Sequence, residues 1–240
     1  MYLEFFRLRA RPFMTAPDPD FLFWAEQHEM AFTMLRYGLL TRAPIIVLTG
    51  DIGAGKTTLL RQMLRELPVD LDVGLISNMQ SGRGALLQWA LAALGQPIDD
   101  GESTVRMFQR FQKHLVDAYA TGRRVILVFD EAQNLGVDTL EELRMLSNIN
   151  SEKDELLQIV LIGQPQLRGL LARPDLVQFA QRISADFHLE SLNREEVEQY
   201  IDHRLTVAGA TWRIFPSRTS ALVYEATRGV PRLINILCDL

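Results

Sequence analysis

The stretch from position 50 to position 57 has residue types and a spacing that could bind phosphate. Glycines stand at positions 50, 53 and 55, and a lysine and a threonine follow directly. Glycines allow the backbone to curl so that successive N–H groups point inward at phosphate oxygens, and a helix that starts at the end of the loop adds partial positive charge. This G-x-x-x-x-G-K-[ST] spacing predicts a nucleoside triphosphate site if a strand precedes it and a helix follows. The predicted nucleotide ligands are Gly50, Asp51, Ile52, Gly53, Ala54, Gly55, Lys56, Thr57 and Thr58.

Individual side chains of this loop have separate predicted roles. Lys56 supplies a mobile positive charge to the outer phosphates, and the Thr57 hydroxyl is a ligand for Mg²⁺. Thr58 could reach the inner phosphate. A glycine-rich turn that merely joins a strand to a helix is the alternative. The strand pattern before the loop and the helix pattern after it favour the phosphate site.

Two acidic residues, Asp130 and Glu131, follow an apolar run at residues 125–129. In a parallel sheet the carboxyl ends of strands line the ligand crevice. Asp130 is therefore predicted to hold Mg²⁺ through its water shell, and Glu131 to orient and deprotonate the water that attacks the γ-phosphate. A solvated turn is the alternative for such a pair taken alone. A phosphotransferase would use a substrate hydroxyl instead of water as the attacking group. A glutamate that activates water therefore favours hydrolysis over phosphate transfer to a substrate.

Two further polar residues are placed to assist hydrolysis. Gln164 follows the apolar run at residues 156–162 and could contact the attacking water or the γ-phosphate. Asn78 lies just beyond another strand and could restrain Glu131 until a partner binds. For Gln164, an ordinary turn residue is the alternative.

Three arginines are candidates for stabilising the charge that develops during hydrolysis. Arg182 precedes the last predicted strand, where an arginine commonly projects into the nucleotide site of a neighbouring subunit and contributes about 10³–10⁵ in rate. Arg173 is a competing candidate. Arg232 follows Pro231, which suits the first turn of a helix, and would face the γ-phosphate as a further nucleotide ligand. For Arg182 an ordinary surface arginine is the alternative, and for Arg232 a merely structural role is the alternative.

Short apolar runs alternate with amphipathic segments along the chain. Strands are predicted at residues 45–49, 73–77, 125–129, 156–162 and 185–189. Helices between them imply crossover connections and a parallel sheet covered on both faces, which is a three-layer α/β fold.

Capping signals mark the starts of several predicted helices. Ser103 is a predicted N-cap. Asp138 with Glu141 predicts a capping box for a helix to about residue 149, and Asn193 with Glu196 predicts a second one. We expect a nucleotide-binding core with an N-terminal aromatic segment at residues 1–191. Residues 192–240 are expected to form a small helical lid that is incomplete at its C-terminal end.

Composition excludes several classes of protein. The chain has 240 residues, of which 48% are hydrophobic and 23% charged, and this suits one large α/β domain. A net charge of −5 without a basic block gives no support to nucleic-acid binding through bulk charge. A single cysteine excludes a disulfide within the chain and indicates a reducing compartment. Apolar runs are far shorter than the roughly 20 residues of a membrane span, so we expect a cytoplasmic domain, with any membrane anchor beyond residue 240.

With these residues in place, the chain resembles the AAA+ ATPases and, more narrowly, the family of general secretion pathway protein A. The resemblance covers essentially the whole chain. The segments that carry it are residues 2–21, 50–58, 128–135, 160–167, 180–183 and 229–239.

The resemblance implies a sheet order of 5-1-4-3-2, an N-terminal segment near the adenine, an Arg182 that acts between subunits of a homo-oligomer, and an Arg232 that acts from the lid. It implies Mg²⁺-dependent ATP hydrolysis that helps to assemble envelope machinery, such as the secretin of type II secretion, a pilus or an exopolysaccharide exporter. Arg7 stands where the family usually has glycine, and residues 26–28 also depart from its pattern, so the adenine contacts are the least defined. The chain also resembles transposition AAA+ proteins, and a nucleotide-gated DNA-binding regulator is therefore the alternative.

Overall fold

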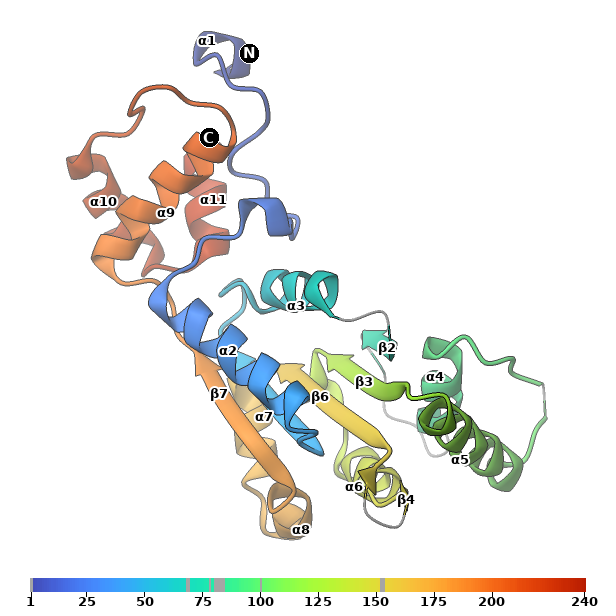
Figure 1. The fold of residues 1–240 in the computed structure, drawn as a ribbon. Helices are drawn as coiled ribbons and strands as arrows, with labels where there is room; N and C mark the ends of the chain where they lie inside the picture. Colours follow the sequence, from blue (N-terminus) through green and yellow to red (C-terminus); the bar gives the residue numbers. More distant parts are fainter. Residues whose placement is uncertain (1, 68–69, 78, 80–84, 100, 152–153) are drawn as a thin grey trace. The chain divides into compact units, whose positions relative to one another are not determined.

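The computed structural model of the protein describes residues 2–67, 70–77, 79, 85–99, 101–151 and 154–240. The chain forms two compact units. The sheet unit consists of Thr33–Thr49 and Leu67–His188, and the helical unit consists of Met1–Phe32, Gly50–Glu66 and Leu189–Leu240. Figure 1 shows the elements of both units.

The sheet unit is built on a five-stranded parallel sheet with the order β2-β3-β6-β1-β7. Its strands are β1 (Ile45–Gly50), β2 (Leu71–Ser77), β3 (Arg124–Asp130), β6 (Leu157–Gly163) and β7 (Ile183–Leu189). Since β6 is the fourth of the predicted strands, this order is the expected 5-1-4-3-2 order read from the other edge. The predicted parallel α/β fold is therefore confirmed. A short antiparallel pair, β4 (Asn150–Ser151) and β5 (Asp154–Glu155), lies outside this sheet.

Helices cover both faces of the sheet, because alternate side chains of a strand point to opposite faces. Ile45 and Val47 pack in one buried cluster with side chains from α4 to α8. Ile46 faces the other side, where a Cβ added to Gly38 of α2 would lie 2.7 Å from Ile46 Cδ1. The helices are α2 (Glu26–Leu40), α4 (Ala85–Ala93), α5 (Thr104–Ala120), α6 (Val137–Leu146), α7 (Pro165–Leu171) and α8 (Val177–Ala180).

The predicted caps of α5 and α9 (Arg194–Val207) are present. Ser103 Oγ accepts a hydrogen bond from the N–H of Arg106 at 3.4 Å. Asn193 and Glu196 form a reciprocal capping box at the start of α9. Both helix starts could be predicted from the sequence because each capping residue and its hydrogen-bond partner lie within one turn of helix.

The predicted capping box at Asp138 is wrong. The helix α6 begins at Val137 with Gly136 as its N-cap, so Asp138 already lies in the first turn, and the helix ends at Leu146. The carboxylate of Glu141 accepts a hydrogen bond from Arg144 Nε at 2.8 Å instead of reaching back to a cap. Asp138 still suits its place, because an acidic side chain in the first turn interacts favourably with the helix dipole.

The helical unit packs its N-terminal segment against its C-terminal helices. The C-terminal helices are α9, α10 (Ser217–Thr227) and α11 (Pro231–Cys238). The same unit also contains α1 (Tyr2–Phe5), the 3₁₀ helix η1 (Pro19–Phe21) and α3 (Lys56–Glu66). Phe13 is 3% exposed and packs with Val197 and Ile234. The buried Arg204 donates to the carbonyls of Pro12 and Met14. These contacts fix residues 12–14 on α9.

The predicted domain boundary near residue 191 stays a prediction. Among the described residues, no helix is both long and apolar enough to cross a bilayer.

Candidate nucleotide-binding site

The predicted phosphate loop connects the end of β1 at Gly50 to the start of α3 at Lys56. The predicted strand before the loop and the predicted helix after it are therefore both present. Gly53 and Gly55 have φ angles of +83° and +104°, which L side chains rarely adopt. The curl of the backbone depends on these glycines.

Lys56 places its charge within this curl. Its side chain is buried, and Nζ donates hydrogen bonds to the carbonyls of Gly50 at 2.7 Å and Asp51 at 2.9 Å. A buried ammonium is costly unless it has polar or anionic partners. The ammonium, together with the N–H groups of the first turn of α3, forms an environment that suits a phosphate. Thr57 and Thr58 lie half-buried in that first turn, so the residues present fit a nucleoside triphosphate.

The start of α11 lies directly against the phosphate loop. The backbone N–H of Arg232 donates to the carbonyl of Gly53 at 3.2 Å. A Cβ added to Gly53 would lie 2.5 Å from Cβ of Arg232. Pro231 occupies the first turn of α11, as predicted. The structure therefore brings Arg232 and the loop together, and the side chain of Arg232 is exposed there.

His28 on α2 also contacts the loop, and the motif analysis did not assign it a role. Its Nε2 lies 3.0 Å from the carbonyl oxygen of Ala54, so the proton of the neutral ring belongs on Nε2. The residue is 4% exposed, and Nδ1 is buried with no hydrogen-bond partner in the described part of the chain. Burial lowers the pKa of His28, although the Ala54 carbonyl and the charge of Glu196 oppose the shift. No spacing in the sequence links positions 28 and 54, so only folding shows this contact.

In the sheet unit, Asp130 and Glu131 lie at the carboxyl end of β3. Asp130 Oδ1 accepts a hydrogen bond from the N–H of Glu131 at 2.9 Å. Glu131 has φ 58° and ψ 38°, a left-handed conformation that costs roughly 1–2 kcal/mol for a residue with a Cβ. The turn directs the chain away from the strand into η2 (Ala132–Asn134). Such strain is common at functional sites.

Two amide side chains hold the carboxylate of Glu131. Gln133 Nε2 donates to Glu131 Oε2 at 2.6 Å, and Gln164 Nε2 donates to the same oxygen at 3.0 Å. The structure thus brings the predicted residues Glu131 and Gln164 together and adds Gln133, which the sequence analysis missed. Asn78, the predicted restraint on Glu131, lies outside the described residues.

Arg182 is held within its own chain. Its guanidinium donates to the carbonyl and the hydroxyl of Ser147, both at 3.2 Å, and to the side chain of Asn148. The competing candidate Arg173 forms an exposed ion pair with Asp175. The predicted action of Arg182 between subunits stays a prediction.

The predicted Mg²⁺ ligands are one hydroxyl and one carboxylate, Thr57 and Asp130. Within the described ranges, no group of three or more histidine, cysteine, aspartate or glutamate side chains could hold a metal ion. Magnesium keeps several waters and binds through one or two carboxylates together with substrate phosphates. The donor set at these two positions is therefore of the kind that Mg²⁺ uses with a nucleotide.

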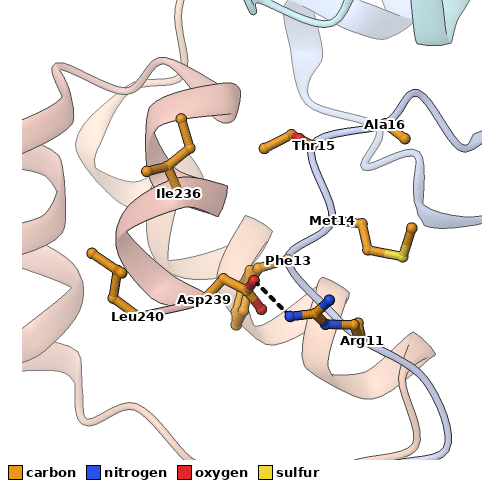
Figure 2. A pocket seen from close by; sticks show the side chains of 8 residues that line it. All are labelled: Arg11, Phe13, Met14, Thr15, Ala16, Ile236, Asp239 and Leu240. Carbon is orange, nitrogen blue, oxygen red and sulfur yellow. Dashed lines mark hydrogen bonds and ion pairs between the residues drawn. The ribbon is translucent and has the colours of Figure 1, made fainter.

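The helical unit also contains an open pocket of about 410 Å³. Figure 2 shows the side chains of Arg11 and Asp239, two of its lining residues, pointing toward each other and joined by an ion pair at 3.4 Å. The pocket is lined by residues 11, 13–16, 236, 239 and 240. It lies at the C-terminal end of α11, whereas the phosphate loop contacts the N-terminal end. At 1.5 Å per residue these ends are about 10 Å apart.

A family comparison covers the segment that contains the phosphate loop and the strand-end acids. The sequence model of the AAA domain family matches residues 40–171, which is more than half of the chain. The chain belongs to the AAA family. Its fold and family are those of P-loop nucleoside triphosphatases.

Similarity to single proteins narrows the place of the chain among AAA proteins. It is 38% identical over 239 residues to general secretion pathway protein A of Aeromonas hydrophila, an alignment that spans 100% of this chain and 44% of that relative. The resemblance to this kind of AAA+ ATPase is therefore confirmed.

Solved structures share the AAA fold at low identity. The ORC2 protein of Aeropyrum pernix, in ADPNP and ADP complexes, aligns with a TM-score of 0.65 at 16% identity, over 89% of this chain and 60% of that one. The ORC1 protein of the same organism, in complex with DNA, aligns with a TM-score of 0.66 at 17% identity, over 95% and 62%. These likenesses confirm the fold.

Proposed function

We propose that the chain is a Mg²⁺-dependent ATPase whose central residues are Lys56, Asp130 and Glu131. The observation that carries this proposal is the phosphate loop. It holds the buried ammonium of Lys56 inside a backbone curl that only glycines at positions 53 and 55 allow. Such a curl at the start of a helix binds the phosphates of a nucleotide.

Each remaining residue has one proposed role. Lys56 binds the outer phosphates, Thr58 contacts the inner phosphate, and Thr57 with Asp130 holds Mg²⁺. The ion, when bound, neutralises charge on the phosphates. Glu131 accepts a proton from the attacking water.

Three polar side chains assist this chemistry in the proposal. Gln164, which shares a hydrogen bond with Glu131, orients the water. Arg232 stabilises the charge that develops on the γ-phosphate, and its backbone contact with Gly53 supports this role. Arg182 does the same for the site of a neighbouring subunit in a homo-oligomer.

We place this activity in the assembly or remodelling of cell-envelope secretion or export machinery. The support is the similarity of this whole chain to part of general secretion pathway protein A. Because the chain spans 44% of that relative, the remodelled partner and a tether at the inner membrane belong to the proposal. A cytoplasmic site of action follows from it, since ATP is available there.

Release of inorganic phosphate from Mg-ATP by the purified chain tests the activity. We expect Lys56→Ala to lose ATP binding, and Glu131→Gln to bind ATP but lose turnover. Lys113→Ala, which changes an exposed lysine on α5, is the matched control and should behave like the parent. A Glu131→Gln variant with the parent rate would remove Glu131 from its proposed role. Phosphate transfer to an acceptor without free phosphate would indicate a phosphotransferase.

A nucleotide-gated DNA-binding regulator is the second candidate. The likeness to an ORC1 protein in complex with DNA concerns the fold at 17% identity, and the net charge of −5 does not favour a polyanion as partner. We expect no appreciable binding of duplex DNA at physiological salt, with or without ATP. Tight binding that weakens steeply as salt increases would favour the regulator instead.

A further inference from the structure

Gln133 links Glu131 and Gln164 in a closed hydrogen-bonded ring at the tips of β3 and β6. Its Nε2 donates to Glu131 Oε2 at 2.6 Å, while its Oε1 accepts the backbone N–H of Gln164 at 2.9 Å. Gln164 completes the ring, because its own Nε2 donates to the same Glu131 oxygen at 3.0 Å. All three residues belong to the sheet unit.

The partners fix which end of the Gln133 amide faces which way. A backbone N–H can only donate, and an ionised carboxylate can only accept. Gln133 must therefore present its oxygen to Gln164 and its nitrogen to Glu131. The amide also passes close to the end of β6, since a Cβ added to Gly163 would lie 2.9 Å from Gln133 Oε1. The side chain is thereby held between two strand tips.

Both donors converge on Oε2 of Glu131. Two hydrogen bonds to one oxygen set the rotation of the carboxylate plane and leave its other oxygen, Oε1, as the one that a water can use. Hydrogen bonds to charged groups are among the stronger ones in proteins, so this orientation is well defined. Glu131 itself is anchored through its backbone N–H to Asp130.

We propose that Gln133 is a positioning residue for ATP hydrolysis, and that it aims Oε1 of Glu131 at the attacking water. This inference rests on the proposed ATPase function. In the step that it serves, one O–H bond of the water breaks and the proton passes to Oε1. The water oxygen bonds to the γ-phosphorus, and the bond to the bridging oxygen breaks with its electron pair on ADP. Gln133 touches neither water nor nucleotide in this account.

The first test is Gln133→Leu, which keeps the size of the side chain but removes both hydrogen bonds. We expect kcat to fall roughly 10–100-fold, because misplacing a catalytic group by about 1 Å can cost about 100-fold. The KM for ATP and the Kd for a non-hydrolysable analogue should stay near the parent values. Gln166→Leu makes the same change at an exposed position of α7 and should keep the parent kcat.

The second test is the pH profile of Gln133→Glu, and it separates positioning from a structural role. An ionised carboxylate at position 133 could not donate to Glu131 and would repel it. A carboxyl that carries a proton could donate again, and one proton shared by two neighbouring carboxyls is held to higher pH than usual. We therefore expect kcat of this variant, relative to the parent, to rise as pH falls from 8 to about 6. The melting temperature is recorded at each pH.

The outcomes separate this inference from the function on which it rests. A parent chain that releases no phosphate overturns the ATPase function. A parent that hydrolyses ATP, with Gln133→Leu within twofold of its kcat, overturns only the role of Gln133. A Gln133→Glu variant whose kcat tracks its melting temperature at every pH would reduce Gln133 to a structural brace, and this also contradicts the proposal.

Discussion

The backbone N–H of Arg232 donates to the carbonyl of Gly53, and this bond joins the first turn of α11 to the phosphate loop. The two residues are far apart in sequence and belong to the same compact unit. A change in the loop at Gly53 therefore affects α11 directly, and a change in the position of α11 affects the loop.

Gly53→Ala should weaken ATP binding by tenfold or more. Alanine at the observed φ of +83° is strained by roughly 1–2 kcal/mol, and its Cβ would lie 2.5 Å from Cβ of Arg232. About 1.4 kcal/mol corresponds to a tenfold loss of affinity. Titration calorimetry with a non-hydrolysable ATP analogue measures this change.

Gly169→Ala is the matched control for that substitution. Gly169 lies within α7, and a Cβ added there would meet nothing within 4 Å. Alanine in a helix is favoured over glycine by up to about 1 kcal/mol, so this variant should bind ATP like the parent. Equal affinities for all three proteins would contradict the tight fit of the loop against α11.

Arg232→Ala should lower kcat about 10²–10³-fold, the usual loss when one donor that stabilises developing charge is removed. The backbone bond to Gly53 does not need the side chain, so the loop should keep its shape and ATP should still bind. Phosphate-release kinetics and analogue affinity are measured together. Arg218→Ala changes an exposed arginine on α10 and should leave both unaffected; a parent-like kcat for Arg232→Ala would exclude its role.

Arg182→Ala should spare ATP binding and abolish hydrolysis in assembled protein. Mixing this variant with Lys56→Ala, which keeps its arginine but lacks a functional loop, should restore part of the activity if the site is shared. Arg173→Ala tests the competing candidate and should keep hydrolysis if Arg182 is the acting arginine, because the exposed ion pair that it removes contributes only about 0–1 kcal/mol.

The contact of Arg182 with Ser147 and Asn148 gives this experiment a second readout. If the arginine serves only to hold the end of α6, the variant should lose thermal stability, and mixing should restore nothing. No recovery of activity in any mixing ratio would argue against action between subunits.

Burial of His28 predicts that stability falls in mild acid. Because burial lowers the pKa of this residue, the unfolded chain, with a histidine pKa near about 6.5, binds more protons than the folded chain below that pH. The contribution of His28 is thus fully present above about 6.5 and is lost as pH falls toward the lowered folded value. Urea unfolding at several pH values measures the slope.

His28→Gln keeps a donor for the carbonyl of Ala54 but cannot titrate, so its stability should fall less steeply between about pH 6.5 and 5. Burial also lowers the pKa of His203, and His203→Gln should therefore remove a separate part of the slope. An acid slope that His28→Gln leaves unchanged would contradict a neutral His28 at the loop.

The sequence determined the parts of this protein whose partners lie close together along the chain. The glycine spacing marked the phosphate loop, the apolar run before Asp130 and Glu131 marked a strand end, and Ser103 marked a cap. The order of the strands also followed, through the family resemblance. Such features depend on local backbone geometry, so residue type and spacing are sufficient to predict them. Asp138 shows the limit, because its capping pattern also occurs inside a helix.

Only the tertiary structure decided which side chains meet at the site. His28 reaches Ala54 across 26 positions, and Gln164 reaches Glu131 across 33. These pairs form because packing of a helix or a neighbouring strand brings them within hydrogen-bond distance, and no periodicity in the chain encodes that distance. The ring around Glu131 became visible for the same reason, since it requires the tips of β3 and β6 to be neighbours.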